Sequence, residues 1–158
     1  MFRYLITISL VLFSCEQPDL HHTTSAFIHK TIASDKANHA VLLNVWATWC
    51  EPCVAEFPMI VDMADKYEND LAVYFISVDW LDEEHKVLSF LKEQSVGWIS
   101  FIKNEKDQEF INGIHSEWSG ALPFTILYGK NSGEVVDFWE GEQPHERFTK
   151  AINKAINS

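Results

Sequence analysis

Residues 46–58 read WATWCEPCVAEFP, and this stretch holds Cys50 and Cys53, two of the three cysteines in the 158-residue chain. The run before it, AVLLNVWA at 40–47, is almost continuously apolar, which predicts a strand buried on both faces. Apolar residues then recur at intervals of three and four, which predicts a helix over 50–67. A disulfide between the two cysteines would close too small a loop to stabilise the fold much, so the pair indicates chemistry.

The position of Cys50 in the first turn of the predicted helix favours a reactive thiolate. Unpaired backbone N–H groups and the positive end of the helix dipole stabilise negative charge there. Cys53 lies one turn further into the helix, where we expect greater burial. Cysteines three residues apart can close a disulfide without large backbone movement. The pair is therefore predicted to exchange disulfides, with Cys50 attacking a partner's disulfide and Cys53 resolving the mixed disulfide.

The residues around the cysteines are expected to tune the pair and to contact its substrate. Pro52 is tolerated in a first helical turn and stiffens it. The charge of Glu51 opposes thiolate formation and modulates the redox potential, while Trp49 and Trp46 offer apolar cover near the exposed sulfur. We therefore predict that Trp49, Glu51 and Pro52 are substrate-binding residues.

Metal and haem binding are the main alternatives for a CxxC pair. A zinc site needs more ligands, and the chain has neither a second CxxC nor a paired His-x-x-x-His. Covalent haem attachment needs a histidine directly after the second cysteine, where Val54 stands. Binding of Cu(I) by two thiolates stays open. We predict no metal, and no cofactor beyond the redox-active Cys50–Cys53 pair itself.

The order of the remaining elements predicts strands that alternate with helices. After the cysteine motif we expect a strand at 71–79, helices at 82–94 and 107–115, a hairpin at 124–129 and 134–139, and a final helix from 144. This order predicts an α/β fold with a central mixed β-sheet flanked by helices. Residues 27–40 are ambiguous and suggest a short strand and a turn.

The composition indicates one globular domain and excludes one class of partner. The chain is 47% hydrophobic and 22% charged, which is typical of a folded domain and not of a disordered segment. Its formal net charge of -11 argues against nucleic acid as a partner.

The N-terminal sequence MFRYLITISLVLFSC predicts an export signal. A helix needs about 20 apolar residues to span a bilayer, and the apolar run here is shorter. It fits the hydrophobic region of a signal peptide. Because the run ends at Cys15, it resembles a lipoprotein-type signal over 1–14, with lipid on the Cys15 sulfur and a linker over 15–26. An ordinary signal peptide with an incidental cysteine is the alternative. The folded domain is then expected over 27–158.

The motif WATWCEPCVAEFP, between its strand and its helix, resembles the TlpA/ResA-like branch of the thioredoxin superfamily. The resemblance implies a thioredoxin-like fold and a cis-proline facing the cysteines, which matches Pro123 in SGALPFTILYG. It implies that the backbone of Leu122 pairs with a substrate strand. It also implies that Glu56 takes the proton of Cys53, the alternative being a solvent-exposed acid. Pro58 matches the family's helix-kinking proline.

The resemblance implies a membrane-tethered, extracytoplasmic thiol-disulfide oxidoreductase on the periplasmic side of a bacterial membrane. It favours reduction of client disulfides, for example in cytochrome c maturation, with electrons from a membrane-embedded thiol donor of the CcdA/DsbD kind. A disulfide oxidase or isomerase and a Cu(I)-binding metallochaperone are the alternatives, and a peroxidase is disfavoured. Trp118, near the proline loop, is expected in the core more than in a substrate groove.

Overall fold

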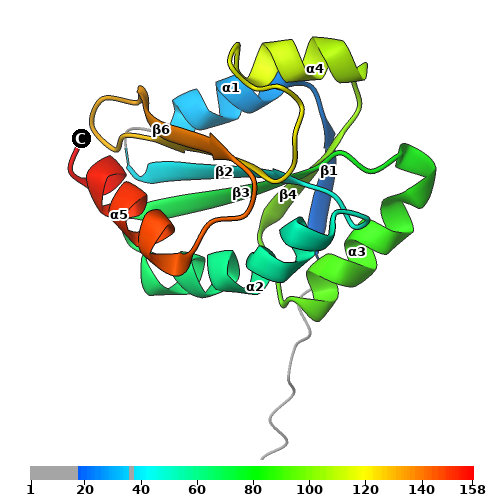
Figure 1. The fold of residues 1–158 in the computed structure, drawn as a ribbon, viewed down its shortest axis with the longest axis horizontal. Coiled ribbons are helices and arrows are strands. Elements are labelled where there is room, and N and C mark those ends of the chain that lie inside the picture. The colour runs from blue at the N-terminus through cyan, green and yellow to red at the C-terminus, as the bar shows by residue number, and fades with distance from the viewer. Residues whose placement is uncertain (1–17, 36–37) are drawn as a thin grey trace, which may run out of the picture.

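The fold is built on a mixed six-stranded sheet, seen in a computed structural model that describes residues 18–35 and 38–158 (Figure 1). The strands lie in the order β1 (Asp19–Thr23), β4 (Ile99–Lys103), β3 (Leu71–Ser77), β2 (Ala40–Trp46), β5 (Phe124–Tyr128) and β6 (Val135–Glu140). The first four are parallel, while β5 pairs antiparallel with β2 and β6 antiparallel with β5. The predicted mixed sheet is therefore confirmed, and the predicted hairpin forms its β5–β6 edge.

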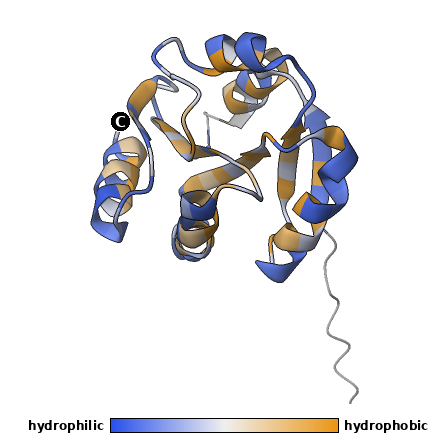
Figure 2. Cartoon of the chain, turned by 45° about the vertical axis from the view of Figure 1, so that its right-hand side comes forward, coloured by the Kyte–Doolittle hydropathy of each residue, from blue (hydrophilic) through white to orange (hydrophobic). Residues whose placement is uncertain are grey.

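Helices cover both faces of this sheet (Figure 1). One face carries α1 (Ser25–Asp35) and α4 (Asp107–Ile114), and the other carries α2 (Glu51–Lys66), α3 (Glu84–Glu93) and α5 (His145–Ile156), with a short 3-10 turn at Leu81–Glu83. Hydrophobic residues concentrate on the strands between these two helical layers, whereas the helices mix hydrophobic and hydrophilic segments (Figure 2).

Strand β2 lies at the centre of the sheet, and every one of its residues is buried. Its side chains alternate between the two faces, as successive residues of a strand must. Leu42 and Trp46 pack in the core beneath α2, and Val41 and Val45 pack in the core beneath α1 and α4. Asn44 shares the parity of Leu42 and Trp46, so it points toward α2.

The predicted linker over 15–26 is wrong from Asp19 onward. Residues 19–23 form β1, which pairs in parallel with β4, and α1 begins at Ser25. The domain therefore starts before the predicted residue 27. Strand β1 is an edge strand whose sequence, DLHHT, lacks the apolar alternation that marks a strand. The segment over 27–40, where a short strand and a turn were expected, instead begins with most of α1. This helix buries two apolar residues on one face, Ile28 and Ile32, which is too weak a periodicity to predict a helix.

The predicted signal peptide over 1–14 and the lipidation site Cys15 lie outside the described residues. Within the residues that are described, no helix is both long and apolar enough to cross a bilayer.

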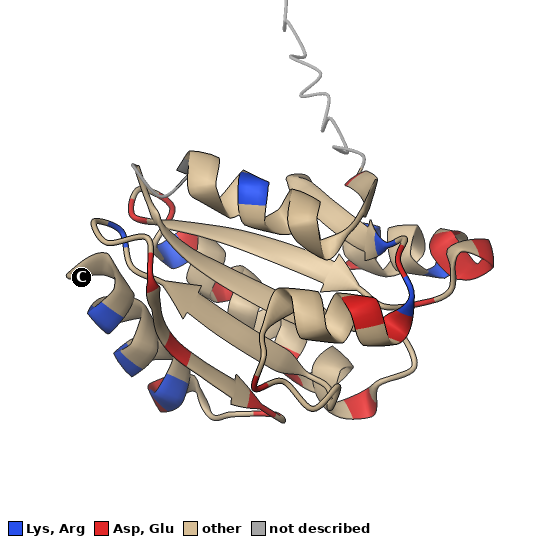
Figure 3. Ribbon diagram, turned by 90° about the horizontal axis from the view of Figure 1, so that it is seen from above, with Lys and Arg blue, Asp and Glu red and all other residues tan. Residues whose placement is uncertain are grey.

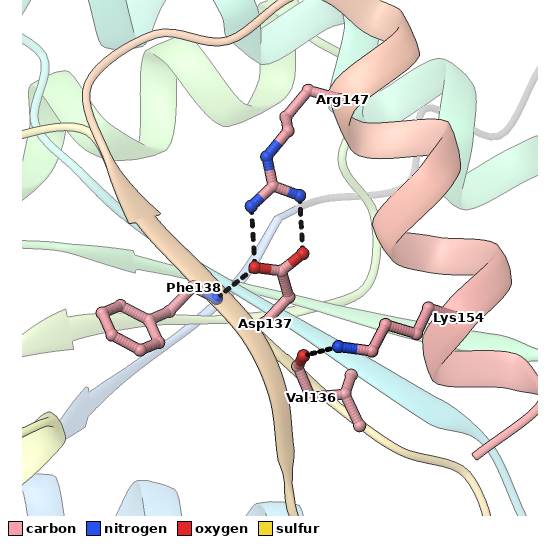
Figure 4. A network of polar contacts seen from close by, with 5 residues as sticks. All are labelled: Val136, Asp137, Phe138, Arg147 and Lys154. Carbon is pink, nitrogen blue, oxygen red and sulfur yellow. Dashed lines mark hydrogen bonds and ion pairs between the residues drawn. The ribbon is translucent and has the colours of Figure 1, made fainter.

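Polar contacts join β6 to α5 (Figure 4). Arg147 on α5 donates two hydrogen bonds to the Asp137 carboxylate on β6, at 2.6 and 2.7 Å. Lys154 Nζ donates to the carbonyl of Val136. The Arg147 hydrogen bonds lower the pKa of Asp137. The loop over 141–144 connects these two elements, and its Gln143 reaches the candidate site.

Charge is distributed unevenly around this fold (Figure 3). Helix α5 carries Arg147, Lys150 and Lys154 on its HERFTKAINKAI sequence, while acidic residues are spread over many other elements.

Candidate redox site

Cys50 and Cys53 lie at the start of α2 and are joined by a disulfide, with their Cα atoms 5.2 Å apart. Cys50 is the N-cap of the helix, and its Sγ accepts a hydrogen bond from the Cys53 backbone N–H at 3.3 Å. The exposed fractions of the two residues are 6% and 1%, so Cys53 is the more buried, as predicted. The sulfur that the helix N-terminus can stabilise is therefore also the one that a partner can reach first.

The peptide bond between Leu122 and Pro123 is cis, as predicted. Pro123 is buried directly before β5, and Val45 of β2 lies opposite Phe124 of β5 in the antiparallel register. The end of β2 that leads to Cys50 and the start of β5 therefore meet at the same edge of the sheet.

Glu56 lies one helical turn beyond Cys53 and has an exposed fraction of only 3%. The alternative of a solvent-exposed acid is therefore wrong. Its Oε1 accepts a hydrogen bond from Asn44 Nδ2 at 3.2 Å, and its Oε2 accepts one from the backbone N–H of Gln143 at 3.3 Å. Burial raises the pKa of Glu56 to about 7, with the two hydrogen bonds opposing the shift and the charge of Glu142 adding to it. A carboxyl group with this pKa can take up and release a proton at neutral pH.

The partners of Glu56 were not predicted from the sequence. Asn44 also donates to the Thr125 hydroxyl at 3.1 Å, across the β2–β5 ladder where the two residues are opposite each other. Gln143 belongs to the loop over 141–144, whose Gly141 N–H donates to the Pro123 carbonyl at 2.8 Å. The one available signal was Asn44 itself, a polar residue in the middle of the apolar run AVLLNVWA.

A second buried carboxylate, Asp79, anchors the loop that leads into the cysteines. Its Oδ2 accepts hydrogen bonds from the Thr48 backbone N–H at 2.9 Å and from Ser77 Oγ at 2.7 Å, and its Oδ1 accepts one from Thr48 Oγ1. Asp79 is the last residue of the strand predicted over 71–79 and lies two residues beyond the observed β3, but its role was not predicted. It ties the residues just before Cys50 to the end of β3.

Tryptophan side chains line a pocket beside the cysteine motif. The pocket has a volume of about 200 Å³, and its walls include Trp49, Trp80, Trp118 and Leu122. The exposed fractions of Trp49 and Trp80 are 58% and 69%, so much of each indole is available to a partner. Trp118 is buried, stacks on Phe124 with ring centroids 4.8 Å apart, and also forms part of the wall.

The other predicted neighbours of the cysteines divide between core and surface. Trp46 is fully buried and packs edge-on against Phe57, so it supports the site from inside and does not reach the surface. Glu51 and Pro52 are exposed on the first turn of α2, and their contact with substrate stays a prediction. Among the residues that the structure describes, no three His, Cys, Asp or Glu side chains lie close enough to hold a metal ion.

A central mixed sheet, a CxxC disulfide at the start of α2 and a cis-proline before β5 together define the thioredoxin-like class of proteins. The sequence matches the AhpC/TSA family over residues 15–152, and the chain belongs to this family.

The chain is also similar to named relatives in sequence and to solved structures in fold. The chain is 32% identical over 121 residues to the thiol-disulfide oxidoreductase ResA of Bacillus cereus, an alignment that covers 76% of this chain and 65% of that relative. The chain thus spans about two thirds of the length of the ResA proteins that it matches. A thiol:disulfide interchange protein of the thioredoxin family from Chlorobium tepidum superposes with a TM-score of 0.64 at 20% identity, covering 78% of this chain and 84% of the other.

A third similarity is again one of fold. The exposed lipoprotein thioredoxin Etrx1 of Streptococcus pneumoniae superposes with a TM-score of 0.60 at 16% identity, covering 78% of this chain and 89% of the other. At these identities, the two solved structures show that the fold is shared.

Proposed function

We propose that the protein is a thiol-disulfide oxidoreductase that reduces disulfides in client proteins. The observation that carries this proposal is the Cys50–Cys53 disulfide at the N-terminus of α2, at the sheet edge where the cis Leu122–Pro123 bond also lies. The similarity to ResA, which is named a thiol-disulfide oxidoreductase, supports the same reaction.

The proposed reaction moves two electrons from the reduced pair to the client. The Cys50 thiolate attacks one sulfur of the client disulfide, forms a mixed disulfide, and releases the other client sulfur as a thiolate. Cys53 then gives up its proton and attacks the Cys50 sulfur. The Cys50–Cys53 disulfide forms and the second client thiolate leaves. A thiol donor must reduce the pair again before the next cycle.

Glu56 is the proposed acceptor of the Cys53 proton. It lies one turn along the same buried side of α2, and its pKa of about 7 lets its carboxylate accept a proton without holding it permanently. Reduction of a client needs this step, because Cys53 must become a thiolate to release the client from the mixed disulfide.

Client binding is proposed to use the tryptophan-lined pocket and the backbone before the cis-proline. An extended client segment would pair with the backbone of Leu122, as the resemblance implies. An apolar side chain beside the client cysteine would enter the pocket between Trp49 and Trp80, where two largely exposed indoles offer apolar contact. Glu51 and Pro52 would face the same segment.

The proposed location is the outer side of a bacterial membrane, with lipid on Cys15 as the anchor. The signal-like sequence before Cys15 supports this, as does the fold shared with an exposed lipoprotein thioredoxin. A membrane tether would keep the enzyme close to a membrane-embedded thiol donor and to clients assembled at the membrane, such as cytochrome c precursors.

Trapping of the mixed disulfide tests the proposed function. In cells that express the full chain, Cys53→Ser should accumulate disulfide-linked complexes with clients, because the resolving thiol is missing. Cys50→Ser is the matched control and should trap none, because the attacking thiol is missing. If Cys53→Ser forms no more complexes than Cys50→Ser does, the exchange mechanism is wrong.

A further inference from the structure

Asn44 connects the acid of the candidate site to the strand that follows the cis-proline. Its Nδ2 lies 3.2 Å from Glu56 Oε1 and 3.1 Å from Thr125 Oγ1, so both hydrogens of the amide are used in one buried chain of hydrogen bonds. The three side chains come from α2, β2 and β5, and all three are buried. Such a chain has little freedom to rearrange.

Two hydrogen bonds stabilise the negative charge of Glu56, and only one of them depends on a side chain. One comes from the Gln143 backbone N–H and reaches Oε2, so it persists for any side chain at residue 143. The other comes from Asn44 and is the only side-chain hydrogen bond to Glu56 that the described residues show. A buried carboxylate is costly unless donors face it, so loss of Asn44 would favour the protonated acid.

Thr125 contributes through Asn44. Its hydroxyl accepts one amide hydrogen and thereby directs the other toward Glu56 Oε1. The other charged group that acts on Glu56 is Glu142 on the loop before α5, and this residue opposes the carboxylate. Cys53 lies one turn before Glu56 on α2 and is the thiol whose proton Glu56 is proposed to accept.

We propose that Asn44, oriented by Thr125, is the positioning residue that keeps Glu56 available as a proton acceptor at neutral pH. The inference rests on the proposed function for its catalytic meaning, but the hydrogen-bond chain itself can be tested without any turnover. Neither residue touches the reacting sulfurs in this account, and both act through Glu56.

The first test is the pKa of Glu56, measured by carbon-13 NMR titration of its carboxyl group in the oxidised full-length protein. Asn44→Leu should raise this pKa by about one unit or more, because a hydrogen bond to a buried charge is lost. Thr125→Val should raise it by less, and Thr125→Ser, which keeps the hydroxyl, should leave it unchanged. An unchanged pKa in both Asn44→Leu and Thr125→Val would overturn the inference.

The second test is the pH dependence of reduction of a peptide with one internal disulfide. In Asn44→Leu, the pH of half-maximal rate should rise together with the pKa of Glu56, and a shift of about one unit gives about a fivefold loss of rate at pH 7. The rate should return to the wild-type value at higher pH. A loss of the same size at every pH would mean that Asn44 is merely structural, and would overturn the inference.

The two tests together separate this inference from the proposed function. If the pKa of Glu56 shifts as expected but the rate profile of Asn44→Leu stays the same as that of the wild type, the hydrogen-bond chain stands and the proton-accepting role of Glu56 fails. Thr125→Val has nearly the same shape as the native residue and Thr125→Ser differs from it by one methyl group, so the Thr125 variants still test the inference if Asn44→Leu does not fold.

Discussion

Two buried carboxylates lie on either side of the cysteine pair, and the structure holds them in different ways. Asp79 is 1% exposed and accepts three hydrogen bonds from Thr48 and Ser77, two of them at 2.9 and 2.7 Å. Glu56 is 3% exposed but accepts only two, at 3.2 and 3.3 Å. The two acids are therefore similarly buried but differ in the number and length of the hydrogen bonds that they accept, and burial raises the pKa of Glu56 to about 7.

This difference assigns separate tasks to the two acids. Asp79 fixes the backbone just before Cys50, so its value lies in stability and in the position of the attacking sulfur. Glu56 lies one turn beyond Cys53, and because burial raises its pKa to about 7, it can change its protonation state at neutral pH. Mutations at the two positions should therefore affect different measurements.

Removal of the Asp79 carboxylate should have the largest effect on stability. Asp79→Ala leaves the partly buried N–H and hydroxyl of Thr48 and the buried hydroxyl of Ser77 without their acceptor, so we expect the free energy of unfolding to fall by about 4 kcal/mol. Urea denaturation of the oxidised protein measures this change. Asp82→Ala removes an exposed carboxylate nearby and is the control; an equal loss in both variants would remove the distinction between buried and exposed acids.

The raised pKa of Glu56 should make the free energy of unfolding depend on pH. Its pKa is raised from 4.5 to about 7, so the folded protein binds a proton that the unfolded chain releases across this range. The contribution of Glu56 is therefore fully present below pH 4.5 and is lost as pH rises toward about 7, a change of about 3 kcal/mol. Because other carboxyl groups also titrate, the quantity to measure is the difference between wild type and Glu56→Gln. A difference that does not vary with pH would contradict the assignment.

Glu56→Gln should also slow the reaction while leaving the fold intact. The amide cannot accept the Cys53 proton, so the rate of client reduction at pH 7 should fall by about 100-fold, which is typical for loss of a general base. Stopped-flow measurement of peptide disulfide reduction would show it. Full activity in Glu56→Gln would leave Glu56 with no more than a structural role, like that of Asp79.

The Asp137–Arg147 ion pair is more exposed than either Asp79 or Glu56, and we expect its loss to have the smallest effect on stability. Arg147→Met should lower the free energy of unfolding by only about 1 kcal/mol, since both side chains are partly solvated. This contribution depends on the lowered pKa of Asp137, so it is present at neutral pH and is lost as pH falls through that lowered pKa. Thermal unfolding at pH 7 and at low pH would measure it, and a loss as large as that of Asp79→Ala would contradict the ranking.

The sequence predicted those features of the site that are local in the chain. The cysteine pair at the start of a helix, the buried central strand and the β5–β6 hairpin all follow from patterns of a few residues. The cis bond at Pro123 was predicted through family resemblance, and the structure confirms it. The edge strand β1 and strand β4 were missed, because neither carries a strong periodic signal.

The hydrogen-bond network was not predictable, because its partners are distant in sequence. Asn44 and Thr125 are separated by 81 positions, and Glu56 and Gln143 by 87. Only the folded sheet brings them together. Glu56 was predicted as a site residue through the family resemblance, but its burial and its hydrogen bonds depend on these remote contacts.

The reduction potential of the Cys50–Cys53 pair tests the central claim most directly. The protein would be equilibrated in dithiothreitol redox buffers at pH 7, and its thiols trapped and counted. A reductase should have a potential below about −240 mV, close to that of thioredoxin. A potential near about −120 mV would mark a strong oxidant and contradict the proposed direction of electron flow.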